Sequence, residues 1–242
     1  MENRGYVILP IRKQIPMDFE LIKTLDDNFW IQDVFFHLLK FYKDYNSTEL
    51  KNKIKKEKLK THSRIEREVA KYIRKYLNND TFFSQYNKAF GEVTNDEDVE
   101  GNYDVLICNT LWGKDFHFEC KNLDLKSLKS NQNLICKYVF YQYQKNSKTT
   151  YDGGVYRYFN GKYAQNQNFG GMLGFILDGD LNTIKEKIIE KLKVSFDEPP
   201  EGDLIENGIV LNSIENNDFT FSSIHKRFDG DFTLYHILLD LK

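Results

Sequence analysis

The chain has 242 residues, of which 40% are hydrophobic and 15% aromatic, and its formal net charge is −2. This composition excludes an intrinsically disordered chain and allows one large or two small folded domains. The three cysteines include no C-x-x-C pair, which argues against a disulfide framework and a structural zinc site. Because no apolar run is long enough for a transmembrane helix, and Gly5–Ile11 is too short for a signal peptide, we expect a cytoplasmic protein.

The first part of the chain is predicted to be helical. Pro16, followed by acidic residues in the next turn, marks the first helix start. Helices are expected over residues 16–42, from residue 47, and over 63–77. Between Lys51 and Tyr76, eleven Lys or Arg residues stand against three Glu. This excess fits an anionic partner, and it equally fits a lysine-rich solvated helix.

The second part of the chain alternates short strand patterns with helices. Strands are expected at 103–108, 115–121, 155–159, 172–177, 209–214, 219–225 and 233–239. Further helices are expected at Leu128–Gln144 and Leu181–Leu192, the second capped by Asp180. This order predicts an α/β fold, with a mixed central sheet flanked by helices. Residues 1–60 are assigned to a helical N-terminal extension packed on a core domain of residues 61–242.

Two neighbouring predicted strands carry acidic residues among apolar ones. Asp104 lies in "GNYDVLI", and Glu119 and Lys121 share one face of "DFHFECK" with His117. A buried acid is costly unless it is paired or binds a cation. If the turn at 109–114 joins the strands as a hairpin, Asp104 and Glu119 converge at one end. Two oxygen ligands with open positions suit Mg²⁺.

Asp104, followed by Glu119-Cys120-Lys121, resembles the motif of the PD-(D/E)xK nuclease superfamily. That family places one acid on the first strand of a hairpin and acid-x-lysine on the second, and usually adds a glutamate from a preceding helix. In "RIEREVAKYI", Glu66 lies nearer the edge of the buried face than Glu68, so the resemblance assigns the role to Glu66, with Glu68 as second choice. It implies a restriction-endonuclease-like fold over residues 61–242.

The resemblance also implies roles for these residues, with Asp104, Glu119, Lys121 and Glu66 as the catalytic set. Asp104 and Glu119, helped by the backbone carbonyl of Cys120, would hold Mg²⁺, for which Mn²⁺ can substitute. Between carboxylates Lys121 is expected to keep its proton, so we interpret it as an ammonium that positions water and stabilises charge. His117 is a candidate for contacting substrate or a second metal, and a structural role stays open.

Further residues are candidates for contacting substrate phosphates. These are Arg157, in "YDGGVYRYFNGKY", and the pair His225 and Arg227, in "FSSIHKRF". A plain hairpin with exposed charges is the alternative for the first segment, and a half-exposed sheet face is the alternative for the second. The glycines of "NFGGMLG" are not a P-loop, because the GxxxxGK[ST] pattern is missing and no helix follows.

Three functions are compatible with these patterns. We expect a Mg²⁺-dependent endonuclease that hydrolyses phosphodiester bonds in DNA. By resemblance it would work in restriction or phage defence, as a homodimer or in a larger defence complex. The second hypothesis is a catalytically inactive nucleic-acid-binding or assembly subunit of the same fold. The third is a generic α/β protein whose strand acids form surface pairs. The set of Asp104, Glu119 and Lys121 favours the nuclease, because a binding module has no need for a carboxylate pair facing a polyanion.

Overall fold

The computed structural model describes residues 25–44, 48–58, 65–91, 93–94, 102–125, 134–160, 163–164, 166–194, 202–214 and 216–242. The predicted helix start at Pro16 lies outside them. The helices are α2 (Asp27–Asp44), α3 (Thr48–Lys58), α4 (Ile65–Asn79), α5 (Leu134–Tyr138) and α6 (Leu181–Leu192), with 3₁₀ helices η2 (Phe83–Gln85) and η3 (Val155–Tyr158). None of the helices in these ranges is long and apolar enough to cross a membrane.

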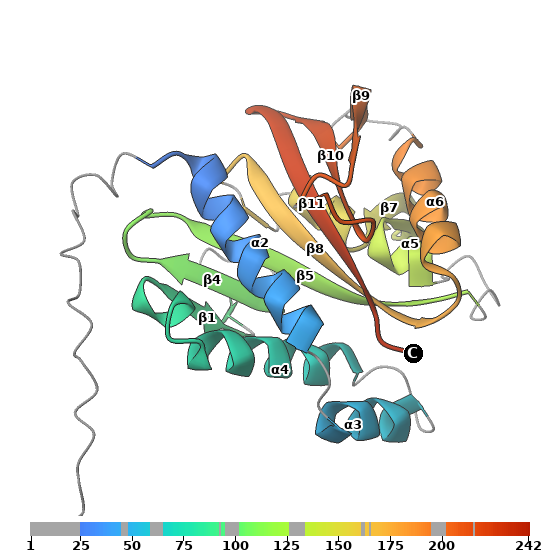
Figure 1. The fold of residues 1–242 in the computed structure, drawn as a ribbon. Helices are drawn as coiled ribbons and strands as arrows, with labels where there is room; N and C mark the ends of the chain where they lie inside the picture. The colour runs from blue at the N-terminus through green and yellow to red at the C-terminus, as the bar shows by residue number, and fades with distance from the viewer. Residues whose placement is uncertain are drawn as a thin grey trace, which may run out of the picture.

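A mixed seven-stranded sheet forms the centre of the fold (Figure 1). In spatial order its strands are β1 (Asn87–Phe90), β4 (Val105–Asn109), β5 (Asp115–Asp124), β8 (Phe169–Asp178), β11 (Gly230–Asp240), β10 (Thr220–Arg227) and β9 (Leu204–Leu211). The central strands β5, β8 and β11 are parallel, and the outer pairs are antiparallel. Two small sheets pair β2 (Val93–Thr94) with β3 (Asn102–Tyr103) and β6 (Tyr141–Lys145) with β7 (Lys148–Asp152). The predicted α/β class and mixed central sheet are confirmed.

Helices α2 and α4 cover one face of the sheet (Figure 1). The buried residues of α4 follow the helical period: Ile65, Val69, Ile73 and Leu77. Phe35 of α2 makes edge contacts with the rings of Phe116 and Phe118 on β5, at centroid distances of 5.4 and 6.0 Å. Helix α2 therefore shares one core with the sheet, and the division at residue 60 stays a prediction.

The opposite face is covered by α5 and α6 (Figure 1), and η3 packs in the same core. Ile184 and Ile188 of α6 are fully buried in this second core, with Phe221 and Leu238 of the sheet. The predicted helix Leu181–Leu192 and its cap are confirmed, because Asp180 Oδ1 accepts a hydrogen bond from Thr183 N at 3.0 Å.

The segment between β5 and β8 differs from the sequence prediction. The predicted helix Leu128–Gln144 is confirmed only over Leu134–Tyr138 (α5), because residues 141–145 form β6. Its first part, residues 128–133, lies outside the described residues. The β6–β7 turn has Asn146 and Ser147 at φ 52° and 62°, the backbone that a two-residue hairpin turn needs. The predicted strand at 155–159 is the 3₁₀ helix η3, whose residues Val155 and Tyr158, three apart, are both buried.

Strand β8 contains the glycines of "NFGGMLG" because aromatic rings lie directly against it. A Cβ on Gly171 would be 2.2 Å from the ring of Phe118 on β5. We expect Gly171→Ala to destabilise the protein by about 1–3 kcal/mol through overpacking, measured by urea denaturation. The double variant Gly171→Ala/Phe118→Leu should lose less than the sum of the single changes. Simple additivity would contradict the steric cause.

Candidate active site

The acidic residues lie where strand β5 extends beyond its neighbour β4. The pairing of these two strands ends at Val105 and Phe118. Further along the same edge, the backbone N–H groups of β5 need other acceptors. Asp104 Oδ2 accepts from Cys120 N at 2.7 Å, and Glu66 Oε1 accepts from Asn122 N at 2.8 Å. Two carboxylates therefore complete the open edge of β5.

Helix α4 fixes both of these carboxylates. It carries Glu66 in its first turn, and the guanidinium of its Arg74 donates to the backbone carbonyl of Asp104 at 2.5 Å. Asp104 lies at a bend between β3 and β4, so the predicted strand 103–108 is interrupted at the acid. Glu68 lies elsewhere on the helix, 3.7 Å from Lys53 Nζ. Of the two glutamates weighed from the sequence, Glu66 is the one that reaches β5.

Glu119 is the most enclosed acid of the group, with 1% of its surface exposed. Its Oε1 accepts from Lys121 Nζ and, at 2.9 Å, from Arg157 Nη1. Its Oε2 accepts from the Tyr163 hydroxyl, also at 2.9 Å. A buried carboxylate is stable only with such compensation. The structure thus brings Arg157, expected from the sequence as a substrate contact, directly onto Glu119.

Lys121 is the positive centre of the cluster. Besides Glu119, its ammonium contacts the backbone carbonyl of Cys120 at 3.0 Å. Burial lowers the pKa of Lys121, but the carboxylates of Glu119, Glu66 and Asp104 outweigh it and hold that pKa above its ordinary value. Burial and the charge of Glu119 raise the pKa of Asp104 to about 7. Lys121 is therefore an ammonium shared among three carboxylates, and its proton is firmly held.

The glycine pair before η3 brings Arg157 to this site. A Cβ on Gly154 would be 2.7 Å from the carbonyl oxygen of Tyr138 and 3.5 Å from Cγ of Glu119. This close approach lets the following turn lie against β5. Arg157 Nε also donates to Asp152 Oδ1 at 3.1 Å, which orients the guanidinium toward Glu119. Tyr163 was not predicted from the sequence. It belongs to no recognised motif, and the surrounding segment contains several other aromatic residues.

His117 lies two residues before Glu119 on β5 and is partly buried. Burial lowers its pKa to about 4, so the imidazole is neutral at neutral pH. The Tyr158 hydroxyl donates to the backbone carbonyl of His117 at 3.0 Å and to that of Gly171 at 2.8 Å, which ties β5 to β8. The choice between a substrate contact and a structural role stays a prediction. The Cys120 thiol is fully buried in the core opposite, as the alternation predicts.

His225 and Arg227 do not form the exposed phosphate-binding face that their alternation suggested. Only 1% and 7% of their surfaces are exposed. His225 bonds to Ser223 Oγ and to the Gly202 carbonyl, at 2.8 and 2.7 Å. The guanidinium of Arg227 donates to the carbonyl of Ala164 at 2.8 Å. The expectation is corrected because the loops around 164 and 202 cover this end of β10.

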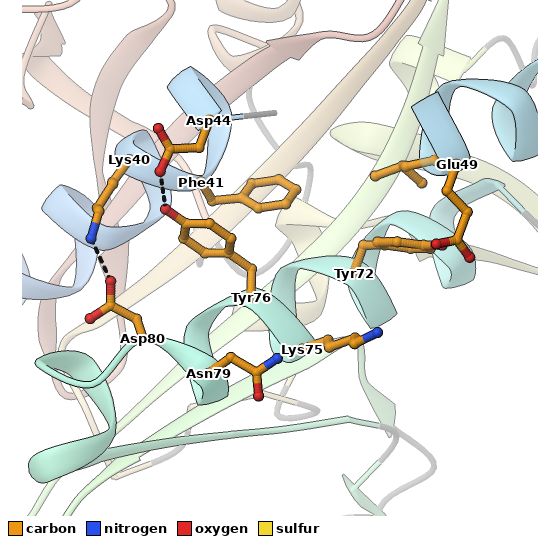
Figure 2. Close-up of a pocket in the computed structure, with 10 residues that line it drawn as sticks. Lys40, Phe41, Asp44, Glu49, Tyr72, Lys75, Tyr76, Asn79 and Asp80 are labelled. Carbon is orange, nitrogen blue, oxygen red and sulfur yellow. Dashed lines mark hydrogen bonds and ion pairs between the residues drawn. The ribbon is translucent and has the colours of Figure 1, made fainter. Parts of the chain in front are cut away.

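A separate cleft of about 490 Å³ lies between α2, α3 and α4 (Figure 2). Lys40 points to Asp80, with 2.6 Å between Nζ and Oδ2, and the Tyr76 hydroxyl donates to Asp44. The charged groups of its wall thus largely pair with one another. Its lining contains none of the acids gathered on β5.

Comparison of the chain with protein-family models, curated proteins and solved structures finds no match. The resemblance to the PD-(D/E)xK motif therefore stays a prediction, which rests on the residues of this chain alone. Among the described residues, no group of three or more His, Cys, Asp or Glu side chains is placed to hold a metal ion. The Lys121 ammonium instead contacts Glu119 Oε1 and the Cys120 carbonyl, two atoms that the motif assigns to a cation.

Proposed function

We propose that this chain is a Mg²⁺-dependent endonuclease of restriction-endonuclease-like fold that hydrolyses phosphodiester bonds in DNA. The observation that carries the proposal is the gathering of Asp104, Glu119, Lys121 and Glu66 around one stretch of β5. They come from a bend, a strand and a helix that are far apart in sequence. A sheet edge needs acceptors, but it does not need a lysine that pairs with Glu119 and lies within the field of Glu66 and Asp104.

The donor set suits a hard divalent cation. Asp104 uses one carboxylate oxygen for Cys120 N, and a carboxylate has lone pairs on its second oxygen. Burial and the charge of Glu119 raise the pKa of Asp104, and the positive charge of Lys121 offsets this only in part. A bound cation would stabilise the charged carboxylate further. Asp104, Glu119 and the Cys120 carbonyl would hold Mg²⁺. When bound, the ion would neutralise phosphate charge and make a coordinated water more acidic.

The chain's own groups would divide the remaining work. Lys121 keeps its proton at Nζ, so it donates hydrogen bonds to the attacking water or to a phosphate oxygen and does not act as the base. Arg157 and Tyr163 hold the Glu119 carboxylate in one orientation. Glu66 anchors the backbone at Asn122, which fixes the position of Lys121 one residue earlier. Each of these contacts limits the movement of the groups that would meet the phosphate.

A second candidate function is a nucleic-acid-binding or assembly subunit that keeps the fold without the activity. The state of Glu119 favours it, since both carboxylate oxygens already accept hydrogen bonds from Lys121, Arg157 and Tyr163. In this alternative the cluster is a structural ion network on the edge of β5. The two functions differ in whether a divalent cation binds with a preference over these donors.

Plasmid nicking and linearisation in Mg²⁺ or Mn²⁺ tests the proposal. We expect cleavage by the wild type, and a fall of about 100-fold or more in Asp104→Asn, Glu119→Gln and Lys121→Ala. Glu186→Gln, an exposed change on α6, is the matched control and should cut normally. An RNA of the same sequence, assayed separately, tests whether RNA is the substrate in place of DNA. Activity that survives the Asp104 and Lys121 changes sinks the assignment, and salt-sensitive binding without cleavage in either metal supports the second function.

A further inference from the structure

The β6–β7 hairpin stands apart from the central sheet. Its strands pair only with each other among the described strands, and the β6 residues after Tyr141 are exposed. Between Tyr141 and Tyr151 the sequence contains lysines and no acidic residue. A two-stranded hairpin with so little buried surface gains little stability of its own. The exposed side chains of β6 contribute little to this stability, so contact with a partner is a role open to them.

One face of the hairpin leads directly to the candidate active site. Tyr141, Tyr143 and Lys145 share this face, because alternate residues of a strand point the same way. The two tyrosine rings lie 6.1 Å apart, and the Tyr141 hydroxyl lies 3.5 Å from Asp152 Oδ2. Asp152 in turn holds Arg157, which bonds to Glu119. A continuous series of contacts runs from the exposed ring of Tyr143 to the buried acid.

We propose that this tyrosine face is a platform for an unpaired nucleic-acid strand, which it directs into the active site. The inference rests on the proposed nuclease function and adds the substrate class: DNA with a single-stranded stretch next to the scissile bond. Aromatic rings beside a basic group are the usual surface for stacking bases while a cation meets the backbone. Tyr143, 37% exposed, offers a ring face, and Lys145 extends from the same face at the hairpin tip.

The hairpin offers a different surface for double-stranded DNA, on its opposite face. Gln142 and Gln144 lie there, and amide side chains can read base edges in a groove that admits a β-ribbon. The amide of Gln144 already donates to Thr149 Oγ1 at 3.1 Å, across the hairpin. The contact path to Glu119 starts from the tyrosines, and for this reason we assign the substrate strand to that face.

Fluorescence anisotropy with a labelled oligothymidylate and a blunt duplex of equal length, both in EDTA, tests the platform. We expect tighter binding of the single strand by the wild type, and a loss of about tenfold in Tyr143→Ala from one stacked base. Tyr143→Phe keeps the ring and should bind normally. Lys145→Ala should weaken binding and lower the salt dependence by roughly one phosphate contact. Gln144→Ala on the other face, and Phe82→Ala at a distant exposed aromatic, are matched controls.

The outcomes separate the two proposals. Wild-type affinity in Tyr143→Ala, or a larger loss in Gln144→Ala with a preference for the duplex, overturns the platform. If plasmid cleavage still depends on Asp104 and Lys121 in that case, the nuclease function stands. If the wild type neither binds DNA nor cleaves it, both proposals fail.

Discussion

Replacement of Lys121 by methionine is expected to destabilise the folded protein by about 1.5–3 kcal/mol at low salt, the loss of a hydrogen bond to a charged group. The ammonium is the charge that Glu119, Glu66 and Asp104 share, and it is only 15% exposed in its side chain. Methionine fills a similar volume but removes a positive charge beside the buried Glu119, which keeps Arg157 and Tyr163 as partners. It removes the same charge from the half-buried Glu66 and Asp104. Urea denaturation followed by circular dichroism measures the loss.

The matched control is Lys114→Met. Lys114 also pairs with an acid, at 2.7 Å from Asp27 Oδ2, but both side chains are more than 40% exposed. Exposed pairs contribute less than about 1 kcal/mol, so the control should stay close to the wild type. Equal losses in the two variants would mean that the cluster on β5 is no more than another surface pair.

Addition of Mg²⁺ distinguishes a cation site from a structural network. If Asp104, Glu119 and the Cys120 carbonyl hold a cation, Mg²⁺ should raise the melting temperature of Lys121→Met more than that of Lys114→Met, because the ion replaces the missing charge. Asp104→Asn in the Lys121→Met background should abolish the extra increase. A Lys121→Met protein that does not respond to Mg²⁺ would favour the inactive subunit.

The sequence predicted the positions of Glu66, Glu119 and Lys121 better than that of Asp104. Glu66 could be chosen over Glu68 because α4 has a strict apolar stripe, which fixes the direction of every side chain on it. Glu119 and Lys121 followed from the alternation of β5. Asp104 was expected within a strand, but it lies at a bend that is held by tertiary contacts with Arg74 and with the backbone N–H of Cys120.

Periodicity in the sequence could not predict the site residues that lie outside the motif. Arg157 was placed on an exposed strand, yet it reaches Glu119 from a 3₁₀ turn. The turn follows two glycines at which a Cβ would clash with the backbone of residues 138–140. Local patterns do not encode such close approach between segments far apart in sequence. The same limit explains His225 and Arg227, whose strand alternates as expected, while the loops that bury them follow no periodicity.

The buried chain of side chains around Ser223 joins Tyr138 to the carbonyl of Gly202. In order, the bonds are Tyr138 Oη to His236 Nδ1 at 2.9 Å, His236 Nε2 to Ser223 Oγ at 2.8 Å, Ser223 Oγ to His225 Nε2 at 2.8 Å, and His225 Nδ1 to Gly202 O at 2.7 Å. A carbonyl only accepts, so His225 Nδ1 carries the proton and Nε2 accepts from Ser223. Ser223 then accepts from His236 Nε2, whose other nitrogen accepts from Tyr138. With neutral rings, the direction of every bond follows from the one at Gly202.

Ser223→Ala should therefore cost about 1–3 kcal/mol for each of the two histidine nitrogens that it leaves without a partner. Burial lowers the pKa of His225 to about 4, despite Gly202 and the charge of Asp203, and lowers that of His236 well below its ordinary value. Because the unfolded histidines bind protons near pH 6.5, this stability is complete above that pH and is lost as pH falls toward 4. Urea denaturation of the wild type should show that decline, and Ser84→Ala, an exposed control, should follow the same curve. A Ser223→Ala loss below about 1 kcal/mol at pH 7.5 would mean that the serine is not the link between the two rings.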